Sequence, residues 1–439
     1  MSETIFALSS APGRAGVAVI RVSGDRAGAA FAALTGRSPP APRRALLARL
    51  QDGSGKPIDQ ALCLWFVAPA SFTGEDVCEF HVHGGRAVIE ALLAELGRMT
   101  GLRPAGPGEF TRRAVEHGKF DLTAAEALAD LIAAETEQQR RLALRQQEGA
   151  LAQVYERWRG QLTRALAWAE AVIDFGEDEV PQSVWAEVHA EAHKLAYEMQ
   201  QHLTDDQRGE LIRDGLTIAV LGPPNAGKSS FVNILARRDV AIVAPSAGTT
   251  RDLIEVRLDL SGYAVTLVDT AGLRQAGEAI EAEGIRRSLA RARSADLRLL
   301  LLDATAPQAV ALLPQEVRDA ADIVVWNKVD LVTPSDRPGL AMSAQTGQGV
   351  AEVVGALAEK VRNRLERPGE APVLTRARHR RAVEEAARAL TRAAAAPQAA
   401  PELMAEDLRL ASRALGRITG AVDVEKLLDL IFRDFCIGK

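Results

Sequence analysis

The chain has 439 residues, of which 47% are hydrophobic and 25% charged, and its formal net charge is −5. This length exceeds what one ordinary hydrophobic core supports and predicts roughly two to four domains. The mild acidity argues against a generally nucleic-acid-binding chain, so any contact with RNA would need a local basic patch or a partner.

Residues 1–118 have mixed character and predict an α+β domain. The segments 17–22, 62–67 and 77–82 alternate or run apolar as strands do, and 86–98 has the pattern of a helix. Frequent Pro and Gly residues mark the turns between them.

The pattern becomes helical at Asp121. Thr123 and Glu126 have the spacing of a capping box, in which a hydroxyl and a carboxylate satisfy free N–H groups at a helix start. Val154, Trp158, Leu162 and Leu166 recur every four residues, which places them on one helical face. We expect residues 121–212 to form two or more long packed helices.

Strand and helix patterns then alternate, which predicts a mostly parallel α/β sheet. The strand candidates are Leu216–Leu221, Leu253–Leu260, Tyr263–Val268, Leu297–Leu302 and Ile323–Trp326. Helical character returns after Pro372 and continues to the end. The α/β unit is therefore expected as an insertion between two helical stretches that pack together.

The cysteines Cys63, Cys78 and Cys436 are widely separated, which argues against a disulfide framework or a zinc site. Cys436 is interpreted as a buried structural thiol, with a reactive thiol as the alternative. The start of the chain lacks the layout of a signal peptide, and no apolar run approaches the ~20 residues of a membrane span. We expect a cytoplasmic protein.

The segment Gly222–Ser229 matches G-x-x-x-x-G-K-[ST] between a predicted strand and a predicted helix, the context that a P-loop requires. Its backbone N–H groups would point at phosphate oxygens. Lys228 would bind the β- and γ-phosphates, and the hydroxyl of Ser229 would bind Mg²⁺.

Two further segments follow in the order typical of nucleotide switches. Asp269–Gly272 (D-x-x-G) comes directly after a strand, so its carboxylate can hold the Mg²⁺ shell and the Gly272 N–H can meet the γ-phosphate. Gly248–Asp252 lies between the P-loop and Asp269, and the Thr250 hydroxyl is the second predicted Mg²⁺ ligand.

Asn327–Asp330 (N-K-x-D) predicts guanine as the base. The two oxygens of Asp330 suit the N1–H and amino group of guanine, a donor pair that adenine lacks. Lys328 can lie over the base, and Ser343 with Ala344 can close on the guanine O6. The predicted nucleotide contacts are Asn225, Ala226, Gly227, Lys228, Ser229, Ser230, Ala244, Pro245, Ser246, Ala247, Gly248, Thr249, Thr250, Asp269, Thr270, Ala271, Gly272, Asn327, Lys328, Asp330, Ser343 and Ala344.

One position departs from Ras-like GTPases, which place a water-orienting Gln after D-x-x-G. Here that residue is Leu273. Either hydrolysis is very slow or another group orients the water, the candidates being Arg274, Glu281, Glu283 or a cation bound near Asn225.

The chain resembles the tRNA-modification GTPases of the MnmE (TrmE) family. The matching segments are Thr4–Ala7, Pro12–Val17, Ile20–Gly24, Ser71–Asp76, His83–Gly85, Pro107–Thr111, Gly118–Leu122, the nucleotide motifs above, Ile418–Gly420 and Ile431–Lys439. They span nearly the whole chain in order, and the terminal Phe-Cys-Ile-Gly-Lys is highly specific.

The resemblance implies three domains: an α+β folate-binding-like N-terminal domain (1–118), an all-α helical domain (119–212 plus 370–439) and an inserted α/β P-loop GTPase domain (213–369). The first would bind a 5-formyl-tetrahydrofolate-type ligand through Arg21, Glu79, Lys119 and Lys439 and would form a homodimer.

The family also implies K⁺ beside Mg²⁺. Its potassium positions fall on Asn225, Thr249 and the backbone of Ala244 and Ser246, and its water-orienting glutamate falls on Glu281. The implied catalytic set is therefore Glu281, Lys228 and Thr250. A cation at this site could neutralise phosphate charge as an arginine finger does.

The implied task is to place an aminomethyl or carboxymethylaminomethyl group on C5 of the wobble uridine in certain tRNAs, with an FAD-dependent partner of the MnmG (GidA) type. GTP hydrolysis would drive conformational change. A ribosome-assembly GTPase is the alternative, although such proteins usually carry an RNA-binding domain or a second G domain. A nucleotide-switched scaffold is another.

Overall fold

The structure is a computed structural model. It describes residues 3–175, 182–205, 207–238, 240–242, 255–269, 293–332, 337–366, 372–397, 400–422, 425–433, 435 and 437–438. The chain divides into two compact units, of which the first contains Met1–Ala129, Gln146–Ala192 and Arg392–Lys439, and the second Asp130–Arg145 and His193–Thr391. Among the helices of the described ranges, none is both long and apolar enough for a membrane span.

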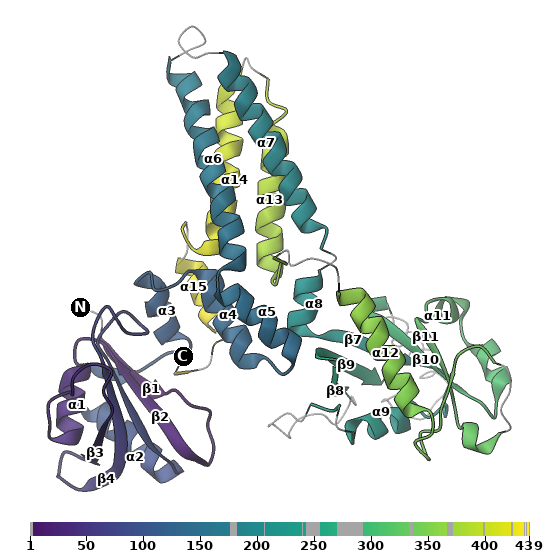
Figure 1. The fold of residues 1–439 in the computed structure, drawn as a ribbon, viewed down its shortest axis with the longest axis horizontal. Helices are drawn as coiled ribbons and strands as arrows, with labels where there is room; N and C mark the ends of the chain where they lie inside the picture. The colour runs from purple at the N-terminus through teal and green to yellow at the C-terminus, as the bar shows by residue number, and fades with distance from the viewer. Residues whose placement is uncertain are drawn as a thin grey trace, which may run out of the picture. The chain divides into compact units, whose positions relative to one another are not determined.

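A mixed sheet of order β3-β4-β5-β2-β1-β6 opens the first unit (Figure 1). Its strands are β1 (Thr4–Leu8), β2 (Ala15–Ser23), β3 (Leu46–Gln51), β4 (Pro57–Phe66), β5 (Val77–Gly84) and β6 (Leu102–Pro104). Alternate side chains such as Ile20, Cys63 and Phe80 pack beneath α1 (Ala27–Thr35) and α2 (Arg86–Arg98) on one face. The sequence-predicted strands at 17–22, 62–67 and 77–82 all lie in this sheet.

The opposite face of this sheet is open over strands β2 to β5. Val17, Leu47 and Leu62 are 56%, 60% and 41% exposed there. Leu47 pairs with Leu62, and Leu62 pairs with His81, so these side chains form a row across the strands. At β1 the same face is covered, because Phe110 packs on Ile5 and Ala7.

Helices follow the first sheet in the first unit, and several helices belong wholly or in part to the second unit. Their bounds are α3 (Glu109–Glu116), α4 (Leu122–Ala133), α5 (Glu137–Gln147), α6 (Ala150–Phe175), α7 (Gln182–Leu203), α8 (Arg208–Asp214), α13 (Ala377–Ala393), α14 (Pro401–Thr419) and α15 (Glu425–Arg433). Helices α6 and α14 lie side by side (Figure 1). Tyr155, Trp158 and Leu162 are buried on one face of α6, and Arg409 of α14 pairs with Glu170 at 2.9 Å.

The capping box predicted at Thr123 is wrong. Helix α4 already begins at Leu122, and the capping side chain is Asp121, whose Oδ1 accepts the Ala124 N–H at 2.8 Å. Thr123 donates its hydroxyl to the same oxygen. The Asp121 carboxylate directly precedes the helix and reaches its first free N–H groups, so Asp121 takes the capping position. Thr123 lies inside the helix and is buried.

The second unit contains a sheet of order β12-β11-β10-β7-β9-β8 (Figure 1). Its strands are β7 (Leu216–Leu221), β8 (Glu255–Leu260), β9 (Tyr263–Asp269), β10 (Leu297–Asp303), β11 (Ile323–Asn327) and β12 (Leu340–Ala341). All neighbours are parallel except β8 and β9. Helices α9 (Lys228–Ala236) and α12 (Val350–Leu365) cover one face and α11 (Gln315–Asp319) the other.

Polar contacts bind α8 and α13 within the second unit. Arg380 pairs with Asp205 at 2.7 Å and with Glu210 at 3.3 Å. Gly209 lies directly against the backbone of Leu374, and a Cβ atom added there would come within 2.1 Å of the Leu374 carbonyl oxygen. Only glycine therefore permits this approach of α8 to the chain before α13.

Candidate functional site

The predicted nucleotide residues that the structure describes gather at one edge of the second sheet. The carboxyl ends of parallel strands meet at the same edge. Strand β7 leads into the P-loop there, β9 ends at Asp269, and β11 ends at Asn327. Ser343 and Ala344 follow β12 at this edge.

The P-loop has the backbone that phosphate binding requires. Gly227 has φ +93°, and a Cβ atom there would lie 2.2 Å from the Asn327 Nδ2 atom, so no other residue suits this position. Lys228 is buried and donates to the carbonyl oxygens of Gly222 and Pro223 at 2.9 and 2.8 Å. Burial lowers the pKa of its ammonium group, against the opposing charge of Asp269.

The predicted Mg²⁺ side of the site pairs a hydroxyl with a carboxylate. Ser229, at the start of α9, donates its hydroxyl to Asp269 Oδ2 at 2.6 Å. Asp269 is fully buried at the end of β9. Hydroxyl and carboxylate oxygens are the ligands that Mg²⁺ prefers, so this pair suits the ion.

On the predicted base side, the Asn327 side chain joins three loops by hydrogen bonds. Its side chain is 2% exposed, donates to the Ala226 carbonyl at 2.8 Å and accepts the Ala344 N–H at 2.9 Å. The next residue, Lys328, pairs with Asp303 at 2.6 Å. Asp330 is exposed. The sequence analysis did not single out Asp303, because one Asp after an apolar strand matches no motif.

Several predicted site residues lie outside the described residues. They are Ala244, Pro245, Ser246, Ala247, Gly248, Thr249, Thr250, Thr270, Ala271, Gly272, Glu281 and Lys439. Their roles stay predictions from the sequence.

The first unit brings two of the predicted folate residues together on the open side of the sheet. Arg21 of β2 and Glu79 of β5 are register partners, and the Arg21 Nη2 atom lies 2.8 Å from Glu79 Oε1. The Arg21 guanidinium lies over the rings of Phe72 and Phe110, at 5.1 and 5.6 Å from their centroids. A charged pair beside aromatic faces can hold a flat, polar heterocycle.

Lys119 is connected to this group through neighbouring residues. Its ammonium donates to the Pro69 carbonyl at 2.6 Å. The adjacent residue Phe120 contacts Phe72, with ring centroids 5.9 Å apart. The aromatic pair Phe72 and Phe110 was missed from the sequence, since only the fold brings both rings to Arg21.

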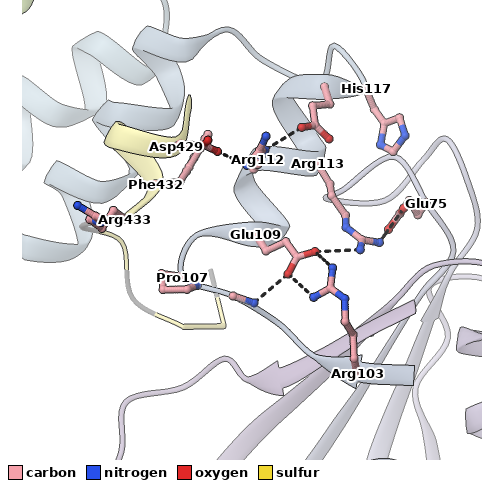
Figure 2. A pocket seen from close by; sticks show the side chains of 12 residues that line it. Glu75, Arg103, Pro107, Glu109, Arg112, Arg113, His117, Asp429, Phe432 and Arg433 are labelled. Carbon is pink, nitrogen blue, oxygen red and sulfur yellow. Dashed lines mark hydrogen bonds and ion pairs between the residues drawn. The ribbon is translucent and has the colours of Figure 1, made fainter. Parts of the chain in front are cut away.

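A cavity of about 710 Å³ lies in the first unit between α3, β6 and α15 (Figure 2). Most of its lining side chains are charged, and Phe432 with Pro107 supplies the apolar part. Arg112 on the rim pairs with Asp429 of α15 at 2.7 Å. The carboxylates and guanidinium groups that line the cavity pair chiefly with each other, so they stabilise the structure around it.

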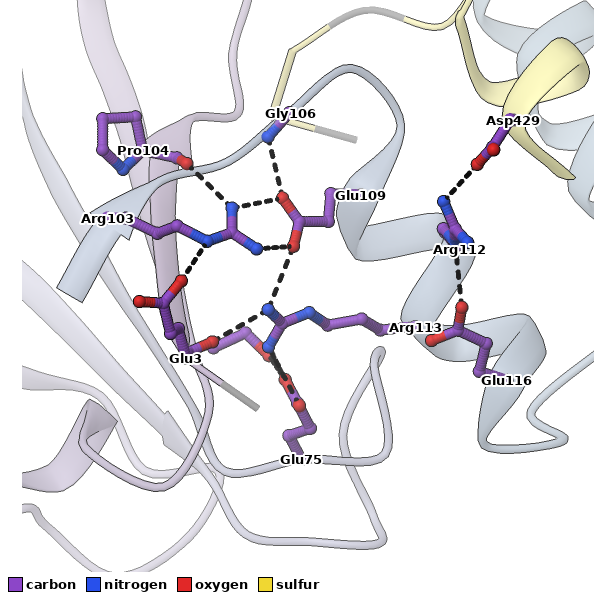
Figure 3. Close-up of polar contacts among 11 residues, drawn as sticks. Glu3, Glu75, Arg103, Pro104, Gly106, Glu109, Arg112, Arg113, Glu116 and Asp429 are labelled. Atoms are coloured by element: carbon purple, nitrogen blue, oxygen red, sulfur yellow. Dashed lines mark hydrogen bonds and ion pairs between the residues drawn. The ribbon is translucent and has the colours of Figure 1, made fainter. Parts of the chain in front are cut away.

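Figure 3 shows this network of carboxylates and guanidinium groups around Glu109 and Arg113. Glu109 accepts two bonds from Arg103, at 2.6 and 2.8 Å, and one from Arg113 at 3.0 Å. Arg113 also binds both oxygens of Glu75, which accepts the Ser23 hydroxyl at 2.6 Å. The network therefore fixes the loop that carries Phe72 beside Arg21.

The ionisation of Glu109 reflects these contacts. Burial alone would raise the pKa of its carboxyl group. Hydrogen bonds from Arg103, the Gly106 N–H and Arg113 outweigh burial and lower the pKa to about 2. The carboxylate is thus held in its charged form by the network.

Comparison with known proteins gives concordant matches along the chain. Residues 122–436 match the family described as the MnmE helical domain, and residues 4–119 match the GTP-binding protein TrmE N-terminus. The chain is 56% identical over 446 residues to a tRNA modification GTPase MnmE of Parvibaculum lavamentivorans, covering 100% of both chains. It is 55% identical over 445 residues to that of Paramagnetospirillum magneticum, again over 100% of both. For Rhodospirillum rubrum the identity is 51% over 456 residues, 100% of this chain and 99% of the relative.

Proposed function

The chain belongs to the MnmE family of tRNA modification GTPases, and we propose that it uses GTP hydrolysis in forming an aminomethyl or carboxymethylaminomethyl group on C5 of the wobble uridine in certain tRNAs. It is a GTP-hydrolysing enzyme. The observation that supports this proposal most is the arrangement of Lys228, Ser229, Asp269 and Asn327 at one sheet edge, in a chain similar to this family over its full length.

The nucleotide roles follow from the chemistry of the side chains. Lys228 binds the β- and γ-phosphates, and Ser229 and Thr250 hold Mg²⁺. The hydrogen bond from Ser229 to Asp269 supports this assignment, because a hydroxyl and a carboxylate oxygen in contact are ligands that suit Mg²⁺. Asp330 reads the donor edge of guanine, and Ser343 with Ala344 closes on the base. Magnesium supplies charge neutralisation at the phosphates.

We further propose that K⁺ binds at Asn225, Thr249 and the backbone of Ala244 and Ser246. Asn225 is exposed in the P-loop with φ +59°, so its side-chain oxygen is available. A monovalent cation there adds positive charge beside the phosphates. Glu281 then orients the attacking water, a task that Leu273 cannot perform.

A 5-formyl-tetrahydrofolate-type ligand is proposed for Arg21, Glu79, Lys119 and Lys439. The charged pair of Arg21 and Glu79 beside Phe72 supports a flat heterocycle with a donor edge, and lysines attract the anionic glutamate tail. The folate supplies a one-carbon unit when bound. Calorimetric titration with 5-formyl-tetrahydrofolate tests the site: Arg21→Ala should lose binding, whereas Arg86→Ala, in an exposed pair, should keep it.

The proposed assembly is a homodimer that works with an FAD-dependent MnmG (GidA)-type protein and tRNA in the cytoplasm. The exposed side chains of Val17, Leu47 and Leu62 on the first sheet support a dimer through this domain, because exposed apolar side chains are frequent at contact surfaces. We propose the domain limits 1–118, 119–212 plus 370–439, and 213–369, with a folate-binding-like first domain and the GTPase domain as an insertion.

The experiment that tests the function measures wobble nucleosides directly. Transfer RNA from a strain lacking the gene is digested, and C5-modified uridines are quantified by mass spectrometry after rescue with wild type, Lys228→Ala or Arg86→Ala. Modified nucleosides should vanish on deletion and return with wild type and Arg86→Ala but not with Lys228→Ala. An unchanged level on deletion would refute the tRNA task and leave ribosome assembly as the leading alternative.

A further inference from the structure

Lys328 of the predicted base site has a fixed partner on the neighbouring strand. Its Nζ atom lies 2.6 Å from Asp303 Oδ2, with the lysine side chain 32% exposed and the aspartate 13%. Asp303 ends β10 and is the register partner of Asn327, which ends β11. The strand pairing therefore places the carboxylate next to the residue that follows Asn327.

The carboxylate of Asp303 is itself held in place. Its other oxygen, Oδ1, accepts the Thr305 N–H at 2.8 Å and the Thr305 hydroxyl at 2.6 Å. Burial favours the neutral acid, but the bonds from Lys328 and Thr305 outweigh burial, and the pKa of Asp303 is lowered. Both oxygens are used, so the group offers Lys328 one defined position.

We propose that Asp303 is a positioning residue for the guanine site: it anchors the ammonium of Lys328 so that the lysine's methylene stem lies against the base while Asp330 reads the base edge. The inference rests on the proposed GTP site. A lysine stem has four flexible carbons, and fixing it on binding costs up to ~2 kcal/mol of rotamer entropy. The ion pair orders the stem before GTP arrives, which preserves affinity.

The test compares Asp303→Asn, Lys328→Ala and the double variant by calorimetric binding of GTP and ITP with Mg²⁺. Asp303→Asn should weaken both nucleotides by about tenfold and equally, the factor that corresponds to ~1.4 kcal/mol. ITP lacks the amino group that Asp330 reads, so an unchanged GTP-to-ITP ratio separates loss of the tether from general damage to the base site. The hydrolysis rate at saturating GTP should stay within about twofold, because affinity rather than transition-state stabilisation is changed.

The double variant gives the sharpest outcome. If Asp303 acts through Lys328, Asp303→Asn should have no further effect when Lys328 is already Ala. A full additional loss in that background would overturn the proposal, as would wild-type affinity of Asp303→Asn. Should Asp303→Asn fail to fold, Thr305→Val, which removes one bond to the carboxylate, must weaken both nucleotides in the same direction and equally, or the proposal fails.

Asp322→Asn is the matched control. Asp322 accepts the Arg298 N–H at 2.8 Å between the same two strands but at their opposite ends, so its loss should leave nucleotide affinity unchanged. Wild-type binding by Lys328→Ala would instead refute the base-site assignment of the proposed function. Weakened binding by Lys328→Ala with normal binding by Asp303→Asn would refute the present inference alone.

Discussion

At the scale of single residues, Asn327 shows how one side chain can join separate motifs. Its amide uses a donor on the P-loop carbonyl of Ala226 and an acceptor on the N–H of Ala344, and the residue is nearly inaccessible to solvent. The sequence predicted a base-binding role for Asn327. Its structural role depends on loops about a hundred residues apart in sequence, which no local pattern encodes.

Asn327→Ala should destabilise the second unit and weaken GTP binding. The buried Ala226 carbonyl and the partly buried Ala344 N–H lose their partner, and leaving a buried polar group unsatisfied costs ~1–3 kcal/mol. Urea unfolding and GTP calorimetry measure both effects. Asn363→Ala on the exposed side of α12 is the matched control and should change neither. Wild-type stability of Asn327→Ala would show that the two bonds contribute nothing.

Glu109 makes a prediction about pH. Its pKa is about 2 in the folded chain against an ordinary value of 4.5. A depressed folded-state pKa means that the stabilisation is fully present above pH 4.5 and is lost as pH falls from 4.5 toward 2. Glu109→Gln should therefore be less stable than wild type at pH 7, and the difference should shrink across that window.

Hydrogen exchange of peptides from β1 and α3 measures this difference locally, which suits a chain with more than one unit. Glu90→Gln is the control, because Glu90 is 60% exposed and pairs with the exposed Arg86. Exposed pairs contribute little. A Glu109→Gln difference that stayed constant down to pH 2 would contradict the role given to its carboxylate.

At the scale of elements, the sequence predicted strands well where apolar runs were bounded by turns, and helix ends less well. Helix α5 begins where the Gln139 side chain accepts the N–H groups of Glu135 and Thr136 and donates to the Arg213 carbonyl. The contact between Gln139 and Arg213 joins residues that are 74 positions apart in the sequence. The break between α4 and α5 was therefore invisible to periodicity, just as Asp121 displaced Thr123 as the cap of α4.

Substitution by alanine should have opposite effects on stability at Gly209 in α8 and at Gly355 in α12. Gly209→Ala should destabilise the second unit by ~1–3 kcal/mol, because the new Cβ meets the Leu374 backbone, which must move. Gly355→Ala should stabilise it by up to ~1 kcal/mol, since open space surrounds its Cβ and alanine favours a helix. The midpoints of urea unfolding measure both changes in stability. If both substitutions changed stability with the same sign, the close packing of α8 on the Leu374 backbone would be refuted.

At the scale of the whole molecule, the family resemblance and the multidomain layout predicted from sequence are confirmed. The motifs predicted one sheet edge as the nucleotide site because each follows the carboxyl end of a strand, and the carboxyl ends of parallel strands meet at one edge. Sequence patterns alone did not predict the exposed sheet face, the ion pairs of Glu109 or the ion pair between Asp303 and Lys328. Each arises from pairing between strands or helices that are separated in sequence.

The two sheets have hydrophobic clusters that share no residue. Calorimetry should therefore record more than one unfolding transition.

GDP with Mg²⁺ at a hundred times its Kd stabilises the folded state that binds it by ~2.7 kcal/mol. Only the transition of the second unit should rise, by roughly 2–4 °C for each kcal/mol. ATP should leave both transitions in place, because adenine lacks the donor pair that Asp330 accepts. If GDP raised all transitions together, the units would unfold as one cooperative body, and nucleotide binding would stabilise the first sheet as directly as the second.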